Sequence, residues 1–255
     1  MSRSIDTLNP MSKFKISSLL AVSAAFIITS FLEAKVVFTD DSVYAQTFEE
    51  GSYGMNDSTE ISSYGEYPWI DNSSIVGWYI VVDDKEQALY RATNGHRQEG
   101  DTGIYLFRRA GDNGALGTIR SPSNSGLTAF GVEIHNDTNR TITGFSVSYL
   151  GQQWQQNEGA EDELTFQYST NAISIKTGNW STVEDLSFVS VADTGTSNFE
   201  GLVITSDSLS KKISGKISGI RLRDGESIWF RWVDLDNKGV DQALSIDSLK
   251  IEPKF

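Results

Sequence analysis

Three aspartates and an asparagine crowd a short segment near the C-terminus, Asp234-Leu-Asp-Asn-Lys-Gly-Val-Asp241. Aspartate at the first and third positions and glycine at the sixth match the start of a calcium loop built from oxygen ligands. Lys238 stands at the fifth position, and Ser245 stands where the bidentate glutamate would be, so the segment is not an EF-hand. Two interpretations stay open. Either Asp234 and Asp241 bind a metal, or the side chains of a hairpin loop cap their own backbone.

A second candidate metal site would join the two ends of the chain. The apolar alternation that starts at Leu244 changes phase by one residue before Leu249, which predicts a β-bulge at Asp247 and its neighbour. If the first and last strands are neighbours, Asp247 would meet Glu49 or Glu50. Two carboxylates with backbone carbonyls would then make a structural calcium site.

A tryptophan among glutamines suggests a different chemistry, the recognition of sugars. Trp154 has amide side chains on both sides, so its indole can stack on a sugar ring while Gln152 and Gln153 bind the hydroxyls. The alternative is that Trp154 folds back over the edge of the core as a lid. Arg91, on a predicted strand, and His96, in a polar loop, complete the candidate ligand-binding residues.

Catalytic constellations are weak in this chain. It has two histidines, no cysteine and no nucleophile elbow, which disfavours a Ser-His-Asp hydrolase and excludes thiol chemistry. Paired carboxylates can supply the acid and base of glycoside hydrolysis. Such pairs occur at Glu161 with Glu163, Glu184 with Asp185, Asp83 with Asp84, and Glu49 with Glu50. Because carboxylates of an acidic protein are usually solvated, we predict no catalytic residue and favour a protein that is not an enzyme.

The elements that must position these residues are short strands. Runs rich in Val, Ile, Phe, Tyr and Thr recur between Gly, Asn, Asp and Ser, with almost no helical period, which predicts an all-β sandwich or barrel. The segment 211–220 has isoleucines at nearly helical spacing, but its internal glycines favour a strand. The candidate strands are 47–49, 77–82, 88–91, 103–110, 116–119, 128–135, 141–150, 163–169, 182–190, 213–222, 227–233 and 243–251.

Composition limits the class of partner. The chain of 255 residues carries a net charge of −13, which disfavours nucleic acids and anionic membranes. Bound calcium and simple solubility both fit such a charge. The absence of cysteine means that the fold relies on its core rather than on disulfides.

The N-terminal residues 1–45 are predicted to be a signal peptide, with Met11 as a possible start. Basic residues precede an apolar run over 19–32, which is too short for a membrane span. Cleavage after Ala45 is preferred, cleavage after Ala34 competes with it, and an uncleaved anchor is the alternative to both. We therefore expect a secreted or extracytoplasmic protein with one domain over residues 46–255 and no membrane span after processing.

Several motifs resemble those of a jelly-roll accessory domain of secreted bacterial proteins. They are Val147-Ser-Tyr-Leu-Gly-Gln-Gln-Trp154, Leu164-Thr-Phe-Gln-Tyr168, Trp229-Phe-Arg-Trp-Val-Asp234 and Gly239-Val-Asp-Gln-Ala-Leu-Ser-Ile-Asp247. Phe48-Glu-Glu-Gly51 and Ile246-Asp-Ser-Leu249 are also similar to galactose-binding-like carbohydrate-binding modules. In those modules the matching acidic residues hold a structural calcium.

The resemblance implies an antiparallel jelly-roll β-sandwich that binds a polysaccharide or cell-surface glycan without catalysis. Two alternatives stay open, a jelly-roll glycoside hydrolase or polysaccharide lyase, and a structural protein of the envelope or matrix. The sequence does not specify the ligand or the oligomeric state.

Overall fold

The computed structural model describes most of the chain beyond the predicted apolar segment. The described residues are 35–49, 65–93, 102–108, 114–120, 125–156, 161–191, 202–203, 209–235 and 241–255. Apart from one 3-10 turn, η1 (Glu184–Leu186), the regular structure within these ranges is β-strand. The prediction of an all-β protein is therefore confirmed. No helix among the described residues has the length and apolar character needed to cross a membrane.

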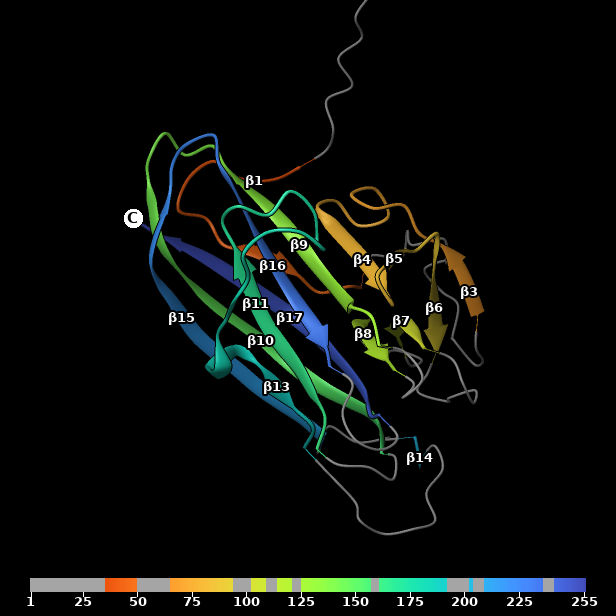
Figure 1. The fold of residues 1–255 in the computed structure, drawn as a ribbon. Helices are drawn as coiled ribbons and strands as arrows, with labels where there is room; N and C mark the ends of the chain where they lie inside the picture. Colours follow the sequence, from red (N-terminus) through yellow and green to blue (C-terminus); the bar gives the residue numbers. More distant parts are fainter. Residues whose placement is uncertain are drawn as a thin grey trace, which may run out of the picture. The chain divides into compact units, whose positions relative to one another are not determined.

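The described strands form two sheets (Figure 1). The first sheet has the order β12 (Ser181–Thr182), β11 (Glu163–Ser169), β16 (Ser227–Asp234), β9 (Thr128–Asn136), β4 (Trp78–Val82) and β5 (Lys85–Glu86), with β1 (Val36–Phe38) beside β9 and β13 (Phe188–Val189) beside β11. The second sheet has the order β14 (Leu202–Val203), β10 (Ile142–Gln156), β17 (Ala243–Lys254), β8 (Ala115–Ile119), β7 (Gly103–Phe107), β6 (Leu89–Thr93) and β3 (Gly65–Pro68). In the second sheet β15 (Ser210–Leu222) lies beside β10, and β2 (Tyr44–Gln46) lies beside β17.

The long strands alternate between the two sheets along the chain. β9, β11 and β16 belong to the first sheet, and β10, β15 and β17 belong to the second. Their pairings are antiparallel, whereas β1 with β9 and β6 with β7 are parallel. This alternation gives the antiparallel jelly-roll β-sandwich that the sequence predicted.

An aromatic core joins the two sheets. Phe230 and Trp232 of β16 point inward by period-two alternation, and both are fully buried. From the opposite sheet, Phe145 meets Phe230 edge-on at 5.3 Å and Tyr149 meets Trp232 edge-on at 5.7 Å between ring centroids. Each such ring contributes about 1.5–3 kcal/mol by burial, so this cluster holds the sheets in their mutual register.

The bulge predicted in the last strand is present. Ser148 of β10 pairs with Lys250 of β17, but Leu150, two residues on, pairs with Asp247, so β17 carries one extra residue there. Ser248 absorbs it with a φ of 51°. Because of this change of phase, apolar residues on both sides of the bulge point into the core. Across the bulge, β17 stays paired with β10 from Ala243 to Lys254.

The first strands of the described chain divide between the two sheets, because β1 pairs with β9 whereas β2 pairs with the last strand, β17. β2 pairs with β17 through Gln46 opposite Leu249, as the second candidate metal site required. The first strands begin earlier than predicted, because β1 already starts at Val36. Phe38 of β1 is buried against Phe145, and the Tyr44 hydroxyl of β2 accepts a hydrogen bond of 2.8 Å from the Trp78 indole N–H. These residues are part of the sandwich, and residues 1–34 lie outside the described part.

One predicted strand, over residues 182–190, is broken in the structure. It divides into β12, η1 and β13. Leu186 of η1 packs on Gly215 of β15, where an added Cβ atom would lie 3.0 Å from the Leu186 side chain. The segment 211–220 forms part of β15, as its glycines indicated.

Candidate functional site

The outer face of the first sheet is covered by the chain itself. The segment between β11 and β12 lays Ile175 on this face, where it joins the buried side chains of Trp229 and Val233. The guanidinium of Arg231 lies 3.7 Å from the ring centre of Trp180 and donates to the Ile175 carbonyl at 2.6 Å. A ligand on this sheet would therefore have to displace an intramolecular contact.

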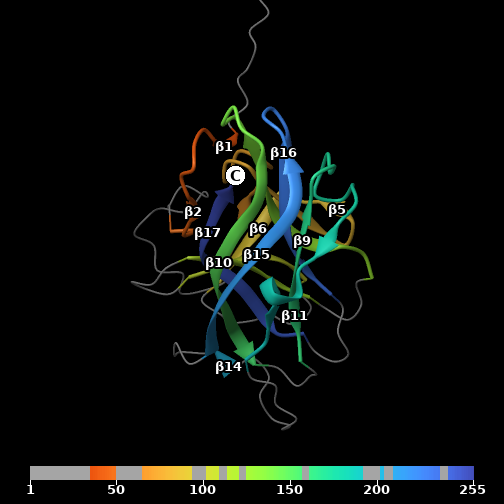
Figure 2. The same cartoon turned by 90° about the vertical axis from the view of Figure 1, so that its left-hand side faces the viewer.

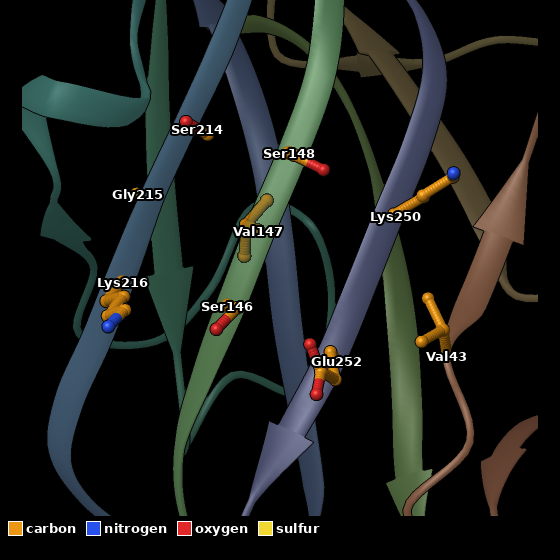
Figure 3. A pocket seen from close by; sticks show the side chains of 9 residues that line it. All are labelled: Val43, Ser146, Val147, Ser148, Ser214, Gly215, Lys216, Lys250 and Glu252. Atoms are coloured by element: carbon orange, nitrogen blue, oxygen red, sulfur yellow. The ribbon is translucent and has the colours of Figure 1, made fainter.

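The outer face of the second sheet carries an open groove. It runs along β10 between β15 and β17 and has a volume of about 400 Å³. Figure 2 shows these three strands, and Figure 3 shows the side chains that line the groove. We call it the β10 groove. Its lining residues are Val43, Ser146, Val147, Ser148, Ser214, Gly215, Lys216, Lys250 and Glu252.

Strand alternation produces the floor of the β10 groove. In the run 144–149, the large residues Phe145, Val147 and Tyr149 are buried in the core, so the small residues between them face outward. Ser146 and Ser148 thus place hydroxyl groups, rather than long side chains, along the centre of the face (Figure 3). The result is a shallow channel with a rigid floor.

The pairing register supplies the rims. Ser146 stands opposite Lys216 of β15 and opposite Glu252 of β17. Ser148 stands opposite Ser214 on one side and Lys250 on the other. Longer charged side chains therefore flank a small polar floor (Figure 3). Hydroxyl and ammonium groups can donate to, and the serines also accept from, a ligand rich in hydroxyls.

Trp154 lies further along β10, inside the protein. Its indole stacks on Phe107 at 5.2 Å, its N–H donates to the Ser245 hydroxyl at 2.8 Å, and its exposed fraction is 4%. It belongs to a second apolar cluster with Tyr105 of β7. This is the packing role that the sequence left as the alternative, and it leaves no free ring face for a sugar in this structure.

The two glutamines beside Trp154 have different surroundings. Gln153 is buried, where it donates to the Gln242 side chain at 3.0 Å and accepts from the Val191 N–H at 2.9 Å. Gln152 is half-buried at the level of Ser210 in β15. Gln153 therefore holds neighbouring segments together.

Arg91, another predicted ligand residue, is not among the residues that line the β10 groove. Arg91 is half-buried on β6, pairs with Glu66 at 3.3 Å, and donates to the Thr102 carbonyl at 2.8 Å. These contacts tie β3, β6 and the start of β7 together. His96 lies outside the described residues.

Asp234 and Asp241 gather in a buried polar cluster near the end of β16. Burial raises the pKa of Asp234 well above its usual value, and the nearby carboxylates of Asp162 and Asp241 raise it further, whereas Arg120 lowers it. Arg120 also donates to the Asp234 carbonyl at 2.5 Å. The Asp162 side chain accepts a hydrogen bond from the Gln242 backbone N–H at 2.9 Å. The Asp162 carboxylate therefore satisfies a backbone N–H group at the start of the segment that leads into β17.

Asp247 occupies a different place, at the bulge in the middle of β17. Its carboxyl is buried and accepts a hydrogen bond from the Ser248 N–H. Glu49 is exposed just after β2, the neighbour of β17, and Glu50 lies outside the described residues. Within the described part of the chain, no three acidic or histidine side chains approach closely enough to form a metal site.

The acidic pair Asp83 and Asp84 has a structural role. Both have positive φ, 53° and 62°, at the centre of the tight turn between β4 and β5. Asp83 accepts from the Gly126 N–H at 2.9 Å and Asp84 from the Leu127 N–H at 3.1 Å. These carboxylates fix a neighbouring loop.

The sequence did not single out the residues of the β10 groove. A signal was present, because serine alternates with buried apolar residues at 145–149 and the lysines of β15 and β17 repeat with spacing four at 212 and 216 and at 250 and 254. The pairing that places these rows side by side is not readable from either segment alone.

Comparisons with known proteins give structural likenesses. A scan against protein-family models gives no match, and a search of curated proteins gives none either. Among solved structures, the CBM22-1 xylan-binding domain of Paenibacillus barcinonensis Xyn10C has 12% identity and a TM-score of 0.42, covering 86% of this chain and 99% of its own. The family 11 carbohydrate-binding module of Clostridium thermocellum has 13% identity and a TM-score of 0.36, covering 76% and 99%.

The K3 cleaved adhesin domain of Lys-gingipain from Porphyromonas gingivalis has 12% identity and a TM-score of 0.41, covering 71% of this chain and 96% of its own.

Proposed function

We propose that this protein is a secreted, non-catalytic carbohydrate-binding module whose ligand lies in the β10 groove. The observation that carries the proposal is an open channel with a floor of serine hydroxyls on the outer face of a rigid sheet. An extended glycan offers a row of hydroxyls to such a floor, and a preformed sheet pays little ordering entropy when it binds.

The residues of the groove favour binding over hydrolysis. Hydrolysis of a glycosidic bond normally needs two carboxyl groups flanking the bond. Among the nine lining residues, Glu252 alone carries a carboxylate, and this carboxylate pairs with Lys254 at 2.5 Å. A groove of this composition can hold a glycan but lacks the usual acid and base.

The proposal is tested with a panel of soluble and insoluble polysaccharides. The wild-type chain is expected to be retained by at least one of them, without release of reducing ends or of unsaturated products. Ser148→Trp fills the floor of the groove and is expected to weaken retention at least tenfold. Ile173→Trp, at a position 86% exposed on the other sheet's side, is the matched control and should bind as wild type does.

Three outcomes would count against the proposal. Turnover of a bound polysaccharide would favour the hydrolase or lyase alternative. Retention that Ser148→Trp leaves unchanged would place the site elsewhere. Retention by no polysaccharide would favour a structural role in an envelope or matrix.

We also propose a structural calcium at Asp247 with Glu49 or Glu50. The supporting observation is that the Asp247 carboxyl is buried at the bulge while β2, which leads into the two glutamates, pairs with β17 beside it. Hard oxygen ligands of this kind suit calcium, which would cross-link the first and last strands.

Chelation tests the calcium proposal independently of any glycan. Removing calcium with EGTA is expected to lower the melting temperature of wild type by several degrees, and added calcium should restore it. Asp247→Asn should remove this dependence, whereas Asp40→Asn, an exposed change of the same charge, should retain it. A melting temperature that ignores EGTA would contradict the proposal.

A further inference from the structure

We infer that the glycan bound in the β10 groove is an acidic polysaccharide whose sugar units carry carboxylates. This inference rests on the proposed function and adds the chemical class of the ligand. It follows from the distribution of charge on the outer face of the second sheet.

Four lysines flank the floor of the groove. Lys212 and Lys216 project from β15 on one side, and Lys250 and Lys254 project from β17 on the other, all on the outer face by alternation. Glu252 is the one acidic residue among the groove's lining residues. This face therefore has a positive balance on a protein whose total charge is −13.

The two lysines nearest the floor are available to a ligand. Lys216 and Lys250 lie on opposite sides of β10 (Figure 3). No carboxylate of the described residues lies within ion-pair distance of either ammonium group, whereas Glu252 pairs with Lys254. A ligand carboxylate placed over the serines would meet an ammonium on each side.

The density of charge favours a carboxylated glycan over denser polyanions. Ser146 stands opposite Lys216 and Ser148 opposite Lys250, so each of these two lysines has a hydroxyl on the neighbouring strand, which matches a sugar unit with one carboxylate and several hydroxyls. Two ammonium groups beside the floor, with one carboxylate near them, match an occasional ligand carboxylate better than the closely spaced sulfates or phosphates of heavily sulfated chains and nucleic acids.

Neutral glycans match the groove less well. Binding of a neutral sugar draws much of its energy from stacking on an aromatic ring. None of the nine lining residues is aromatic, and Val43 is the one exposed apolar side chain among them. The interactions that the groove can offer a ligand are therefore mainly ionic contacts and hydrogen bonds.

A matched pair of probes tests the inference. Polygalacturonate and its fully methyl-esterified form share one backbone, and only the first carries charge; neutral xylan and heparin complete the panel. We expect polygalacturonate to bind at least tenfold more tightly than the ester, and to lose affinity as salt rises from 50 to 500 mM.

Variants locate the effect. Lys216→Gln with Lys250→Gln is expected to lower polygalacturonate affinity at least tenfold. Lys85→Gln with Lys176→Gln removes the same charge from pairs with Asp83 and Glu86, away from the groove, and should lower affinity less than twofold. Circular dichroism establishes that both double variants are folded.

The outcomes separate this inference from the proposed function. Binding to neutral xylan or to the ester, but not to polygalacturonate, would overturn the inference and leave a carbohydrate-binding module. Preference for heparin would overturn the assignment of carboxylates. An equal loss of polygalacturonate affinity in the two double variants would show that the ligand does not bind in the β10 groove. Binding to none of the glycans would overturn both proposals.

Discussion

At the scale of single residues, Trp154 shows that one sequence pattern can fit two different roles. A tryptophan among glutamines is typical of a sugar platform, but here the indole is held between Phe107 and the Ser245 hydroxyl. Trp154 therefore contributes to stability, and in the proposed site the polar contacts come from small residues, Ser146 and Ser148, which are less conspicuous in a sequence.

Replacing Trp154 by alanine tests this role. We expect Trp154→Ala to lower the free energy of unfolding by about 3–5 kcal/mol, because it leaves a cavity and an orphaned hydroxyl. Urea unfolding measures the loss. Ile173→Ala, at an exposed position, should stay within about 0.5 kcal/mol of wild type. Wild-type stability of Trp154→Ala would contradict the packing described here.

Asp234 predicts a pH dependence of stability. Its folded pKa is raised, chiefly by burial and then by Asp162 and Asp241. The favourable contribution of the protonated carboxyl is therefore fully present below its unfolded pKa, near 3.9, and is lost as pH rises through the folded pKa. Asp234→Asn should consequently melt higher than wild type at pH 8, and this advantage should shrink toward pH 4.

The exposed Asp40 provides the control for charge alone. Its pKa is lowered, chiefly by the Ser42 side chain, so Asp40→Asn should give no gain at pH 8. Thermal melts of both variants across this pH range decide the matter. An Asp234→Asn variant that melts below wild type at pH 8 would show that the buried carboxylate is stabilising.

At the scale of elements, the bulge of β17 carries a measurable strain. Ser248 adopts a φ of 51°, which costs a non-glycine residue about 1–2 kcal/mol, while glycine loses about 0.5–1 kcal/mol through entropy. Ser248→Gly should therefore stabilise the protein by about 0.5–1 kcal/mol in chemical denaturation.

Gly219 allows the opposite substitution, in which a glycine with positive φ is replaced by a residue that has a Cβ atom. It has a φ of 74° in β15, and no atom lies within 4 Å of an added Cβ, so Gly219→Ala changes conformation without a clash. We expect a loss of about 1 kcal/mol. If Ser248→Gly destabilised while Gly219→Ala did not, the strain argument would fail at both positions.

The first two strands bear on where the predicted signal peptide would end. Cleavage after Ala45 would remove β1 and cut β2, whereas cleavage after Ala34 would leave both strands intact. We therefore propose Ala34. A chain starting at Lys35 should be at least about 3 kcal/mol more stable than one starting at Gln46, because the second loses the buried Phe38. Equal stabilities, or a mature N-terminus at Gln46 by mass spectrometry, would contradict this.

At the scale of the whole molecule, the sequence predicts what depends on local pattern. The alternation of apolar and polar residues predicted the all-β class, and the change of phase before Leu249 predicted the bulge. Both could be predicted because the face to which each side chain points follows from its position within a single strand. The β10 groove depends instead on pairings between strands far apart in the chain, such as Ser146 with Lys216. Residues from separate strands become a site only when the register is known.

A titration followed by NMR shows whether the β10 groove binds carbohydrate. Isotope-labelled protein is mixed with acidic and neutral oligosaccharides, and shifts of the backbone amides report where each one binds. We predict saturable shifts concentrated at Ser146, Ser148, Ser214, Lys216 and Lys250 with at least one oligosaccharide. Shifts confined to other parts of the molecule, or none with any of them, would contradict a carbohydrate-binding function of the β10 groove.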